Sequence, residues 1–293
     1  MPHHQLVFEL AGDQLEHAEE ACRRLGAIAL SLADAGDEPL LEPAPGETPL
    51  WQAIRLRAIF SASIEPKIAA ATLEAVLGLA PGSVGIESVE DRAWEREWLK
   101  DFRPMRFGHR LWVCPAGQRP DRPAPVVLEL DPGLAFGTGT HPTTAMCLEW
   151  LDGAIAGGER VLDFGCGSGI LALAALKLGA ASAGAFDIDP QALVATRENA
   201  AKNGLSERIA VARLAGDVAG PFDIVLANIL SGPLIGLAPG LAPRVRAGGR
   251  IVLAGMLERQ AGEVAQAYRP WFDIGPAAER DGWTLLAGRR RAE

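Results

Sequence analysis

The chain has 293 residues, of which 48% are hydrophobic and 22% charged, a composition that suits one large or two ordinary globular domains. The formal net charge is −9, which argues against a general nucleic-acid binder, because phosphate contacts need clustered Lys and Arg. The four cysteines contain no C-x-x-C pair, so neither disulfides nor a metal site is expected. Without a signal-peptide pattern or an apolar run long enough for a bilayer, we expect a cytoplasmic protein.

Residues 1–88 predict a small α+β domain. Apolar alternation indicates four strands, and helical spacing indicates two helices. The strands are Gln5–Leu10, Ala27–Leu32, Trp51–Phe60 and Val84–Val89, and the helices are Asp13–Leu25 and Glu65–Leu77. The order β-α-β-β-α-β is that of a ferredoxin-like sandwich. Because this domain contains no catalytic constellation, we expect it to serve in recognition or dimerisation, with inert padding as the alternative.

Residues 89–108 predict a linker helix between this domain and the rest of the chain. Trp94 and Trp98 lie four positions apart among charged residues and therefore share one helix face. We interpret the pair as packing rather than as a ligand-stacking platform.

Residues 109–293 predict a second, larger domain. It begins with two expected strands of a β-ribbon, Arg110–Cys114 and Val126–Leu130, separated by a proline-containing loop. The glycine-rich stretch DPGLAFGTGTHPTT follows at 131–144. A helix then begins at Pro142, a residue favoured in the first helical turn, and runs to about Leu151.

Three side chains of the glycine-rich stretch are candidates for a ligand site. Thr144 lies in the first helical turn and can offer its hydroxyl to a ligand. His141 either faces the ligand or only caps the helix. Phe136 is positioned to shield the site from water as part of a mobile lid.

The stretch ERVLDFGCGSG at 159–169 predicts a strand, a glycine turn and a helix, the unit that opens a nucleotide-binding sheet. Asp163 lies near the end of the strand. Three glycines follow at alternate positions: Gly165, Gly167 and Gly169. A dinucleotide fingerprint would need Gly or Ala at the position of Ile170, which is too large. The spacing D-x-G-x-G-x-G instead resembles the first motif of the S-adenosylmethionine-dependent methyltransferases.

The next apolar run, Ala183–Phe186, ends in two acidic residues that can serve different purposes. An acidic side chain at this strand end can accept hydrogen bonds from both ribose hydroxyls of an adenosine. We assign Asp187 to the ribose and Asp189 to the N-cap of the helix that begins at Pro190. Cys166, within the glycine turn, is interpreted as a small tolerated side chain rather than a nucleophile, because no partner base is evident.

The remainder of the chain continues the strand–helix alternation. The expected helices are Pro190–Asn203, Pro233–Leu241 and Glu258–Tyr268, and the expected strands are Ile209–Leu214, Phe222–Ala227, Ile251–Ala254, Trp271–Ile274 and Trp283–Ala287. This alternation predicts a mostly parallel sheet with helices on both faces and an antiparallel edge. The fold class is therefore α/β, a Rossmann-like domain with a small N-terminal ferredoxin-like domain. The basic tail Arg289–Arg291 is interpreted as solvated, with contact to ribosomal RNA as a weaker alternative.

Asn228 follows the strand Phe222–Ala227 and is the main catalytic candidate. Amino-methylating enzymes often carry Asn or Asp here, followed by Pro-Pro and an aromatic residue. The side-chain carbonyl accepts an N–H from the target amine. Ile229 and Leu230 replace the two prolines, which favours an aliphatic amine over a flipped nucleobase. The alternative is that Asn228 is only a turn residue.

Several stretches together closely resemble the bacterial ribosomal protein methyltransferases that modify large-subunit protein L11. They lie at 94–108, 131–144, 161–180, 187–193 and 227–234. The resemblance implies a recognition domain, a linker helix and a class I methyltransferase domain that trimethylates lysine side chains and the terminal α-amino group. It implies S-adenosyl-L-methionine as cofactor, with family contacts at Thr144, Gly165, Asp187 and Asn228. We expect a monomer that binds neither a membrane nor, directly, nucleic acid.

Three other functions remain open at this point. The chain can be a methyltransferase of another protein or of a small-molecule amine, or a cofactor-binding regulator without catalysis. A nicotinamide-dependent oxidoreductase is disfavoured by Ile170.

Overall fold

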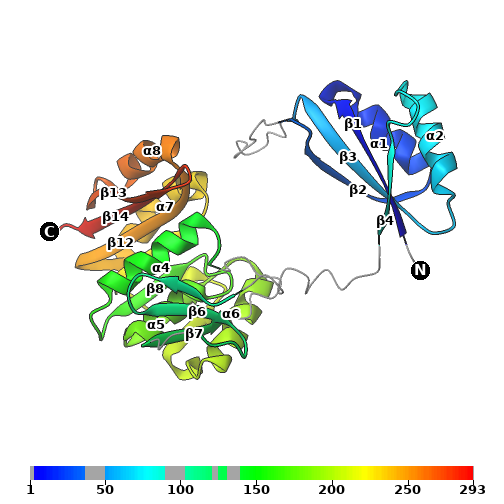
Figure 1. Ribbon diagram of the computed structural model, residues 1–293. Helices are drawn as coiled ribbons and strands as arrows, with labels where there is room; N and C mark the ends of the chain where they lie inside the picture. The colour runs from blue at the N-terminus through cyan, green and yellow to red at the C-terminus, as the bar shows by residue number, and fades with distance from the viewer. Residues whose placement is uncertain (1–2, 37–49, 90–102, 121–124, 131–138, 293) are drawn as a thin grey trace. The chain divides into compact units, whose positions relative to one another are not determined.

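The computed structural model describes residues 3–36, 50–89, 103–120, 125–130 and 139–292 (Figure 1). The chain divides into two compact units, Met1–Ala93 and Trp94–Glu293. The stretch with Trp94 and Trp98, expected as a linker helix, lies outside the described residues.

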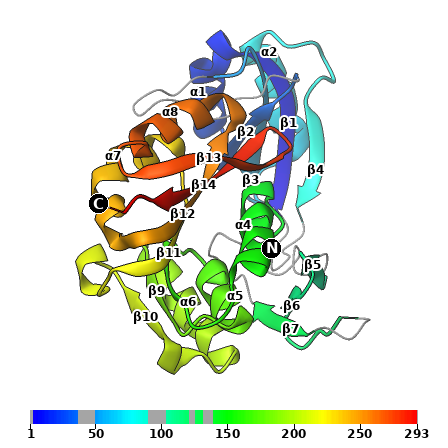
Figure 2. The same cartoon turned by 90° about the vertical axis from the view of Figure 1, so that its left-hand side faces the viewer.

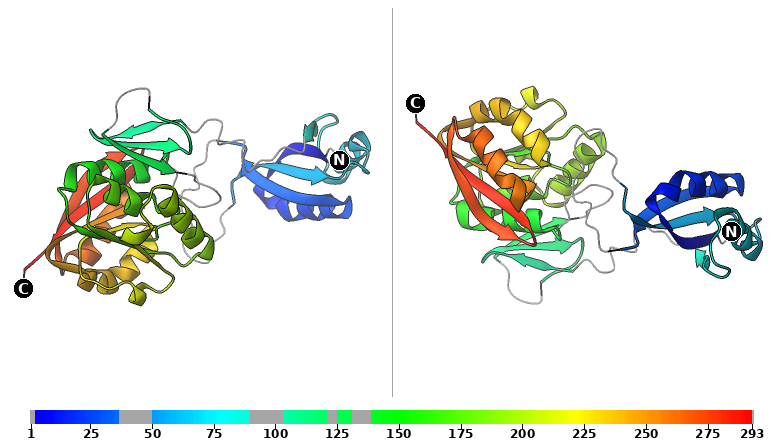
Figure 3. Two further views of the ribbon diagram at one scale, coloured as in Figure 1. Left: turned by 90° about the horizontal axis from the view of Figure 1, so that it is seen from below. Right: turned by 90° about the horizontal axis from the view of Figure 1, so that it is seen from above.

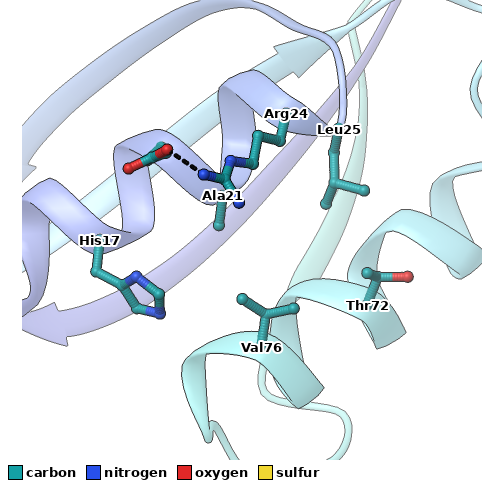
Figure 4. A pocket seen from close by; sticks show the side chains of 7 residues that line it. His17, Ala21, Arg24, Leu25, Thr72 and Val76 are labelled. Atoms are coloured by element: carbon teal, nitrogen blue, oxygen red, sulfur yellow. Dashed lines mark hydrogen bonds and ion pairs between the residues drawn. The ribbon is translucent and has the colours of Figure 1, made fainter.

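The N-terminal unit contains a four-stranded antiparallel sheet with strand order β2-β3-β1-β4. Its elements are β1 (His3–Ala11), α1 (Leu15–Arg24), β2 (Ala27–Asp34), β3 (Ala53–Phe60), α2 (Pro66–Leu77) and β4 (Gly85–Val89). Alternate residues of β1, namely Leu6, Phe8 and Leu10, are buried in one core with Leu73 of α2. Helices α1 and α2 lie side by side (Figure 4). The elements therefore follow the order that the sequence predicts.

The C-terminal unit is built on a seven-stranded sheet with strand order β10-β9-β8-β11-β12-β14-β13. The strands are β8 (Arg160–Phe164), β9 (Ser182–Phe186), β10 (Ile209–Ala212), β11 (Phe222–Asn228), β12 (Val245–Leu257), β13 (Phe272–Arg280) and β14 (Trp283–Arg290). The first five strands of that order pair in parallel, whereas β14 is antiparallel to both of its neighbours. The predicted parallel sheet with an antiparallel edge is confirmed.

Helices cover both faces of this sheet (Figure 3). They are α4 (Pro142–Ala154), α5 (Ile170–Leu178), α6 (Pro190–Lys202), α7 (Ser231–Leu241) and α8 (Glu258–Tyr268). Successive strand residues face opposite cores: Val161 of β8 packs with α4 and α5, whereas Leu162 packs with α7 and α8. Helices α7 and α8 lie beside the β12–β14–β13 edge (Figure 2). Burial on both faces explains why these strands are almost continuously apolar.

A separate three-stranded sheet, β5 (Met105–Phe107), β6 (Leu111–Pro115) and β7 (Val126–Leu130), packs against α4 and α5. It corrects two expectations. Strand β7 pairs in parallel with β6 and therefore does not form a ribbon with it. The expected linker helix 89–108 includes β5, which pairs antiparallel with β6. Apolar packing explains this strand pairing, because Phe107 of β5 and Leu111 of β6 are buried in the core of the larger unit.

Candidate active site

The candidate site lies at the carboxyl ends of β8, β9 and β11. In the parallel ladders Phe164 pairs with Phe186 and with Ala227, so the residues that follow these strands emerge at the same edge. The strand order reverses between β8 and β11, and such switch points form the ligand crevice of open α/β sheets. The structure thus brings the glycine turn, Asp187 and Asn228 to one edge, as the sequence predicts.

Two glycines of the turn adopt backbone conformations that an L side chain disfavours. Gly165 has φ +82°, and a Cβ there would collide with the Cγ2 methyl of Ile229. Gly169 has φ +81°, and a Cβ there would lie 2.8 Å from Cγ2 of Thr196. Close approach of neighbouring side chains therefore leaves space only for a bare backbone.

The glycine turn is held by hydrogen bonds from both sides. The backbone N–H groups of Gly165 and Cys166 donate to the carbonyl of Phe186 at 2.8 and 3.0 Å. On the other side, two side chains of α6 donate to the turn: Thr196 Oγ1 to the Gly167 carbonyl and Asn199 Nδ2 to the Ser168 carbonyl, each at 3.0 Å.

Thr196 and Asn199 were missed at the sequence level. Both are buried polar residues three positions apart on α6, the spacing that places two side chains on one helix face. That spacing was the available signal, because a buried polar side chain is expected to have a hydrogen-bond partner.

Asp187 and Asp189 have separate structural roles. Asp187 Oδ2 accepts a hydrogen bond from Gly167 N at 2.9 Å, and Oδ1 accepts one from Asp189 N at 3.0 Å. Each carboxylate oxygen has a second lone pair, so both can still accept from a diol. Asp189 Oδ1 accepts from Gln191 N at 2.9 Å as the N-cap of α6, which confirms the predicted cap. The ribose role of Asp187 stays a prediction.

Asp163 is fully buried near the end of β8, and its Oδ2 accepts a hydrogen bond from Ala172 N at 3.1 Å. Oδ1 has no hydrogen-bond partner within the described part of the chain. Burial raises the pKa of this carboxyl to about 7, the Ala172 bond opposes the rise, and the charge of Asp187 adds to it. An unpartnered buried oxygen next to the glycine turn marks a place where a ligand or water can donate a hydrogen bond.

Asn228 and Thr144 meet although they are far apart in the sequence. Asn228 Nδ2 donates a hydrogen bond to Thr144 Oγ1 at 3.2 Å, and Thr144 is buried in the first turn of α4. Because the amide nitrogen makes this contact, the carbonyl oxygen is the part of the side chain that remains available as an acceptor. The arrangement fits the predicted contact between that oxygen and a target amine.

His141 caps α4, as one of its two interpretations predicts. Its Nδ1 accepts a hydrogen bond from Thr143 N at 3.3 Å and lies 2.7 Å from the Thr143 hydroxyl. Its ring meets Trp283 edge-on, with the ring centroids 4.8 Å apart, and burial lowers the pKa of the imidazole. The contact with Trp283 could not be predicted from the sequence, in which this residue belongs only to an expected edge strand. Phe136 lies outside the described residues.

Neither a thiol nucleophile nor a metal stands out near the turn. Burial raises the pKa of the Cys166 thiol, which opposes thiolate formation and agrees with its interpretation as a small packed side chain. In the described ranges, no group of three or more His, Cys, Asp or Glu side chains is placed to hold a metal ion. Across the same ranges, no helix has the length and apolarity needed to cross a membrane.

Comparison with known proteins agrees with this geometry. The model of the family described as ribosomal protein L11 methyltransferase (PrmA) matches residues 2–291. The chain belongs to this family. Among family relatives, the ribosomal protein L11 methyltransferase of Pseudomonas paraeruginosa is 49% identical over 294 residues and 100% of both chains. The one from Methylococcus capsulatus is 51% identical, over 98% of this chain and 99% of its own.

A solved structure of the L11 methyltransferase family shows the same fold. The ribosomal protein L11 methylase from Lactobacillus delbrueckii subsp. bulgaricus matches with a TM-score of 0.60 and 34% identity, over 65% of this chain and 100% of its own. The Rossmann-like methyltransferase fold predicted from the glycine turn and the strand–helix alternation is therefore confirmed.

Proposed function

We propose that the protein transfers methyl groups from S-adenosyl-L-methionine to lysine side chains and to the terminal α-amino group of ribosomal protein L11. The observation that carries the proposal is the hydrogen bond from Asn228 to Thr144 beside a glycine turn and an acidic strand end. Family membership over nearly the whole chain supports the same substrate.

The residues around the glycine turn fit the cofactor. When bound, S-adenosyl-L-methionine supplies a methyl group on a sulfonium, which is already activated for in-line displacement. Asp187 is the acceptor for the ribose hydroxyls, and the turn Gly165–Gly169 provides bare backbone, because Cβ atoms at its ends would collide with Ile229 and Thr196. Asp163 accepts a hydrogen bond from Ala172 N in the first turn of α5 and keeps one buried oxygen without a partner among the described residues.

Asn228 is the proposed catalytic residue, and its task is to orient the nucleophile. Its carbonyl oxygen accepts an N–H of the neutral amine, which directs the nitrogen lone pair at the methyl carbon at roughly 3–3.5 Å. Thr144 anchors the amide by accepting a hydrogen bond from its nitrogen, which leaves the carbonyl oxygen for the amine. His141 and Phe136 complete the proposed amine pocket, His141 from the α4 cap and Phe136 from the glycine-rich stretch before it.

The pocket must also present the amine without its proton. A lysine with a pKa near 10.4 is almost entirely an ammonium at pH 7, and reaching the neutral amine costs roughly 4–5 kcal/mol. Removal of water disfavours the charged form and lowers this cost.

The remaining proposals concern the whole protein. The N-terminal unit, proposed as residues 1–88, recognises L11, residues 89–108 connect it to the catalytic domain, and residues 109–293 bind the cofactor and catalyse the transfer. The net charge of −9 suits a basic protein substrate. We further propose a monomeric cytoplasmic enzyme.

Mass spectrometry of purified L11, incubated with the enzyme and deuterium-labelled S-adenosyl-L-methionine, tests the proposal. The expected result is mass gain in labelled methyl steps on lysine side chains and the α-amino group. Enzyme with Asn228→Ala, for which kcat is expected to be about 100-fold lower, serves as the impaired control. If labelled methyl groups appeared on another protein of a ribosomal extract and not on L11, L11 would be rejected as the substrate. Methyl transfer would still be the reaction.

A further inference from the structure

A group of arginines lies at the opposite end of the parallel strands from the glycine turn. We name it the arginine rim; its members are Arg160, Arg244, Arg246, Arg250, Arg289, Arg290 and Arg291. Arg160 begins β8. Arg244 directly precedes β12, and Arg246 and Arg250 lie in its first part. Arg289 and Arg290 end β14, and Arg291 directly follows it. The amino ends of β8, β11 and β12 are neighbours in the sheet, so these side chains share one edge.

Contacts among the described residues link the rim into one surface. Asp223 accepts hydrogen bonds from the Arg160 backbone N–H at 2.8 Å and from Arg246 Nε. The Arg160 guanidinium donates to the Ala219 carbonyl at 2.9 Å, and the Arg244 guanidinium donates to the neighbouring Val218 carbonyl at 3.3 Å. Arg290 donates to the Val245 carbonyl, which precedes Arg246.

One contact within the rim is electrostatically unfavourable. Arg250 and Arg289 are directly paired across the antiparallel β12–β14 ladder, the position in which like charges repel most. Arg250 donates to the Ala154 carbonyl at 3.0 Å and lies over the Trp150 ring, whereas Arg289 donates to the Gly248 carbonyl. Burial is the largest cause that lowers the pKa of Arg250, Glu159 opposes it, and Arg289 adds to the lowering.

Carboxylates neutralise only part of this charge. Arg246 pairs with Asp223 and Arg291 pairs with Asp273, while Glu159 acts on Arg250 from a distance. Asp223 also acts on Arg160 and Arg250 through its charge, and these two guanidinium groups lie over the Phe222 and Trp150 rings. The hydrogen bonds from Arg160, Arg244, Arg250 and Arg289 go to neutral backbone carbonyls, which orient a guanidinium and leave its charge in place. The rim is therefore a local positive surface on a protein of net charge −9.

We propose that the arginine rim binds the phosphate backbone of RNA. Guanidinium groups bind phosphate oxygens in a bidentate manner and remain charged at any physiological pH. Anionic phosphates between Arg250 and Arg289 would relieve the repulsion of that pair. Among the described residues of the larger unit, the exposed apolar side chains of Ile188, Leu214 and Leu230 lie two residues beyond the carboxyl ends of β9, β10 and β11, the edge opposite the rim, which disfavours insertion of the rim into a lipid surface.

The proposal replaces the expectation of no direct nucleic-acid contact. That expectation used net charge, which averages over the entire surface, whereas phosphate binding depends on local concentration of arginines. The proposal is also independent of the methyl acceptor, because the rim lies at the strand ends opposite Gly165 and Asn228.

Fluorescence anisotropy with the full-length protein tests the proposal. The probe is a fluorescein-labelled single-stranded RNA of mixed sequence, about 20 nucleotides long, titrated over a series of KCl concentrations. The test variant combines Arg246→Gln, Arg289→Gln and Arg291→Gln. The control variant removes equal charge from exposed arginines of the N-terminal unit by Arg23→Gln, Arg24→Gln and Arg55→Gln.

We expect the rim variant to bind RNA at least about tenfold more weakly than wild type and to reduce the slope of log affinity against log salt by about 2. The control variant should retain wild-type affinity within about threefold. Both variants should keep wild-type circular dichroism, and the rim variant should keep wild-type methyl transfer to the free protein substrate. If the wild-type enzyme transferred no methyl groups to this substrate, the proposed function would be rejected. The conclusion drawn from RNA binding would not change.

Three outcomes would overturn the rim proposal. One is absence of RNA binding by wild type at low salt, and another is equal loss of affinity in the two variants. The third is selective binding to vesicles of phosphatidylglycerol and phosphatidylcholine without binding to RNA, which would assign the surface to anionic lipid. If the rim variant loses its fold, the single variants Arg289→Gln and Arg291→Gln decide, each with an expected loss of about two- to threefold.

Discussion

The side-chain amide of Asn228, at the end of β11, donates a hydrogen bond to the hydroxyl of Thr144 in α4, 84 positions earlier in the chain, at 3.2 Å. This contact joins a strand of the sheet to the first turn of the helix that His141 caps. In this geometry the amide nitrogen is engaged by the hydroxyl, and the carbonyl oxygen is left available to an amine.

Removal of Asn228 is expected to affect the reaction more than cofactor binding. Asn228→Ala should keep the Kd for S-adenosyl-L-methionine within about threefold and lower kcat by about 100-fold, because misplacement of a nucleophile by about 1 Å has that effect. Thr144→Val removes the hydroxyl that accepts from the amide and should lower kcat by about tenfold, whereas Thr144→Ser keeps a hydroxyl and should retain most of the activity. Calorimetry and steady-state kinetics provide the two readouts, and unchanged kcat in Asn228→Ala would remove it from the mechanism.

The two neighbouring aspartates provide a matched test of the cofactor site. Asp187→Ala should weaken binding of S-adenosyl-L-methionine by at least about tenfold, because the ribose loses a charged acceptor. Asp189→Ala should leave the affinity within about threefold and lower the free energy of unfolding by about 1 kcal/mol, because it removes only the α6 N-cap. Equal losses of affinity in the two variants would contradict the assignment of the ribose to Asp187.

Gly165 should tolerate no side chain. Gly165→Ala is expected to lower the free energy of unfolding by about 1–3 kcal/mol, since it combines a positive φ with a collision against Ile229. Gly153, in α4, is the control: a Cβ there meets no atom within 4 Å, and Gly153→Ala should be neutral or stabilising by up to about 1 kcal/mol. Urea titrations give both values.

The double variant Gly165→Ala with Ile229→Ala separates the two causes of that loss. Relief of the collision should make the double variant less destabilised than the sum of the single variants. Strict additivity would show that backbone strain alone is responsible.

Asp163 should make stability depend on pH between about 4 and 7. Burial raises the pKa of this acid to about 7 in the folded state, from an ordinary value near 3.8. Between those values the folded protein binds more protons than the unfolded chain, so this group's contribution to stability is present at low pH and is lost as pH rises through 7. Asp163→Asn should therefore become more favourable relative to wild type at pH 8 than at pH 5, as measured by urea unfolding without cofactor.

Asp223 is the matched control for this pH effect. Burial opposes the shift, but hydrogen bonds from Arg160 and Arg246 lower the pKa of Asp223 below its ordinary value. Its contribution is lost only as pH falls through the acidic range, so the difference between Asp223→Asn and wild type should stay constant from pH 5 to 8. If the stability difference from wild type changed with pH equally in Asp163→Asn and Asp223→Asn, the effect would come from the general loss of a negative charge and not from the buried Asp163.

Local signals allowed most elements and part of the site to be predicted from the sequence. The glycine turn, the cap at Asp189 and the helix start at Pro142 each depend on residues within a few positions of one another. Asn228 was found because the end of a buried parallel strand is a fixed place for function in this fold class.

Contacts between distant segments escaped prediction. The parallel pairing of β6 with β7 depends on packing against α4 and α5, and no local pattern distinguishes it from a ribbon. The contact of Trp283 with His141 brings the β14 edge to the start of α4, and strand-level analysis does not show which helix covers that edge. The arginine rim likewise becomes visible only when strands from separate parts of the chain share one end.

Helix α6 starts at the Asp189 cap, and its middle holds the glycine turn through Thr196 and Asn199. A nucleoside seated on this turn therefore rests on a single helix as well as on the sheet. Local opening of any element needs at most the free energy of global unfolding. Any local opening of α6 would thus release the turn while the sheet stays folded, so a substitution that loosens this helix would weaken nucleoside binding without contacting the nucleoside.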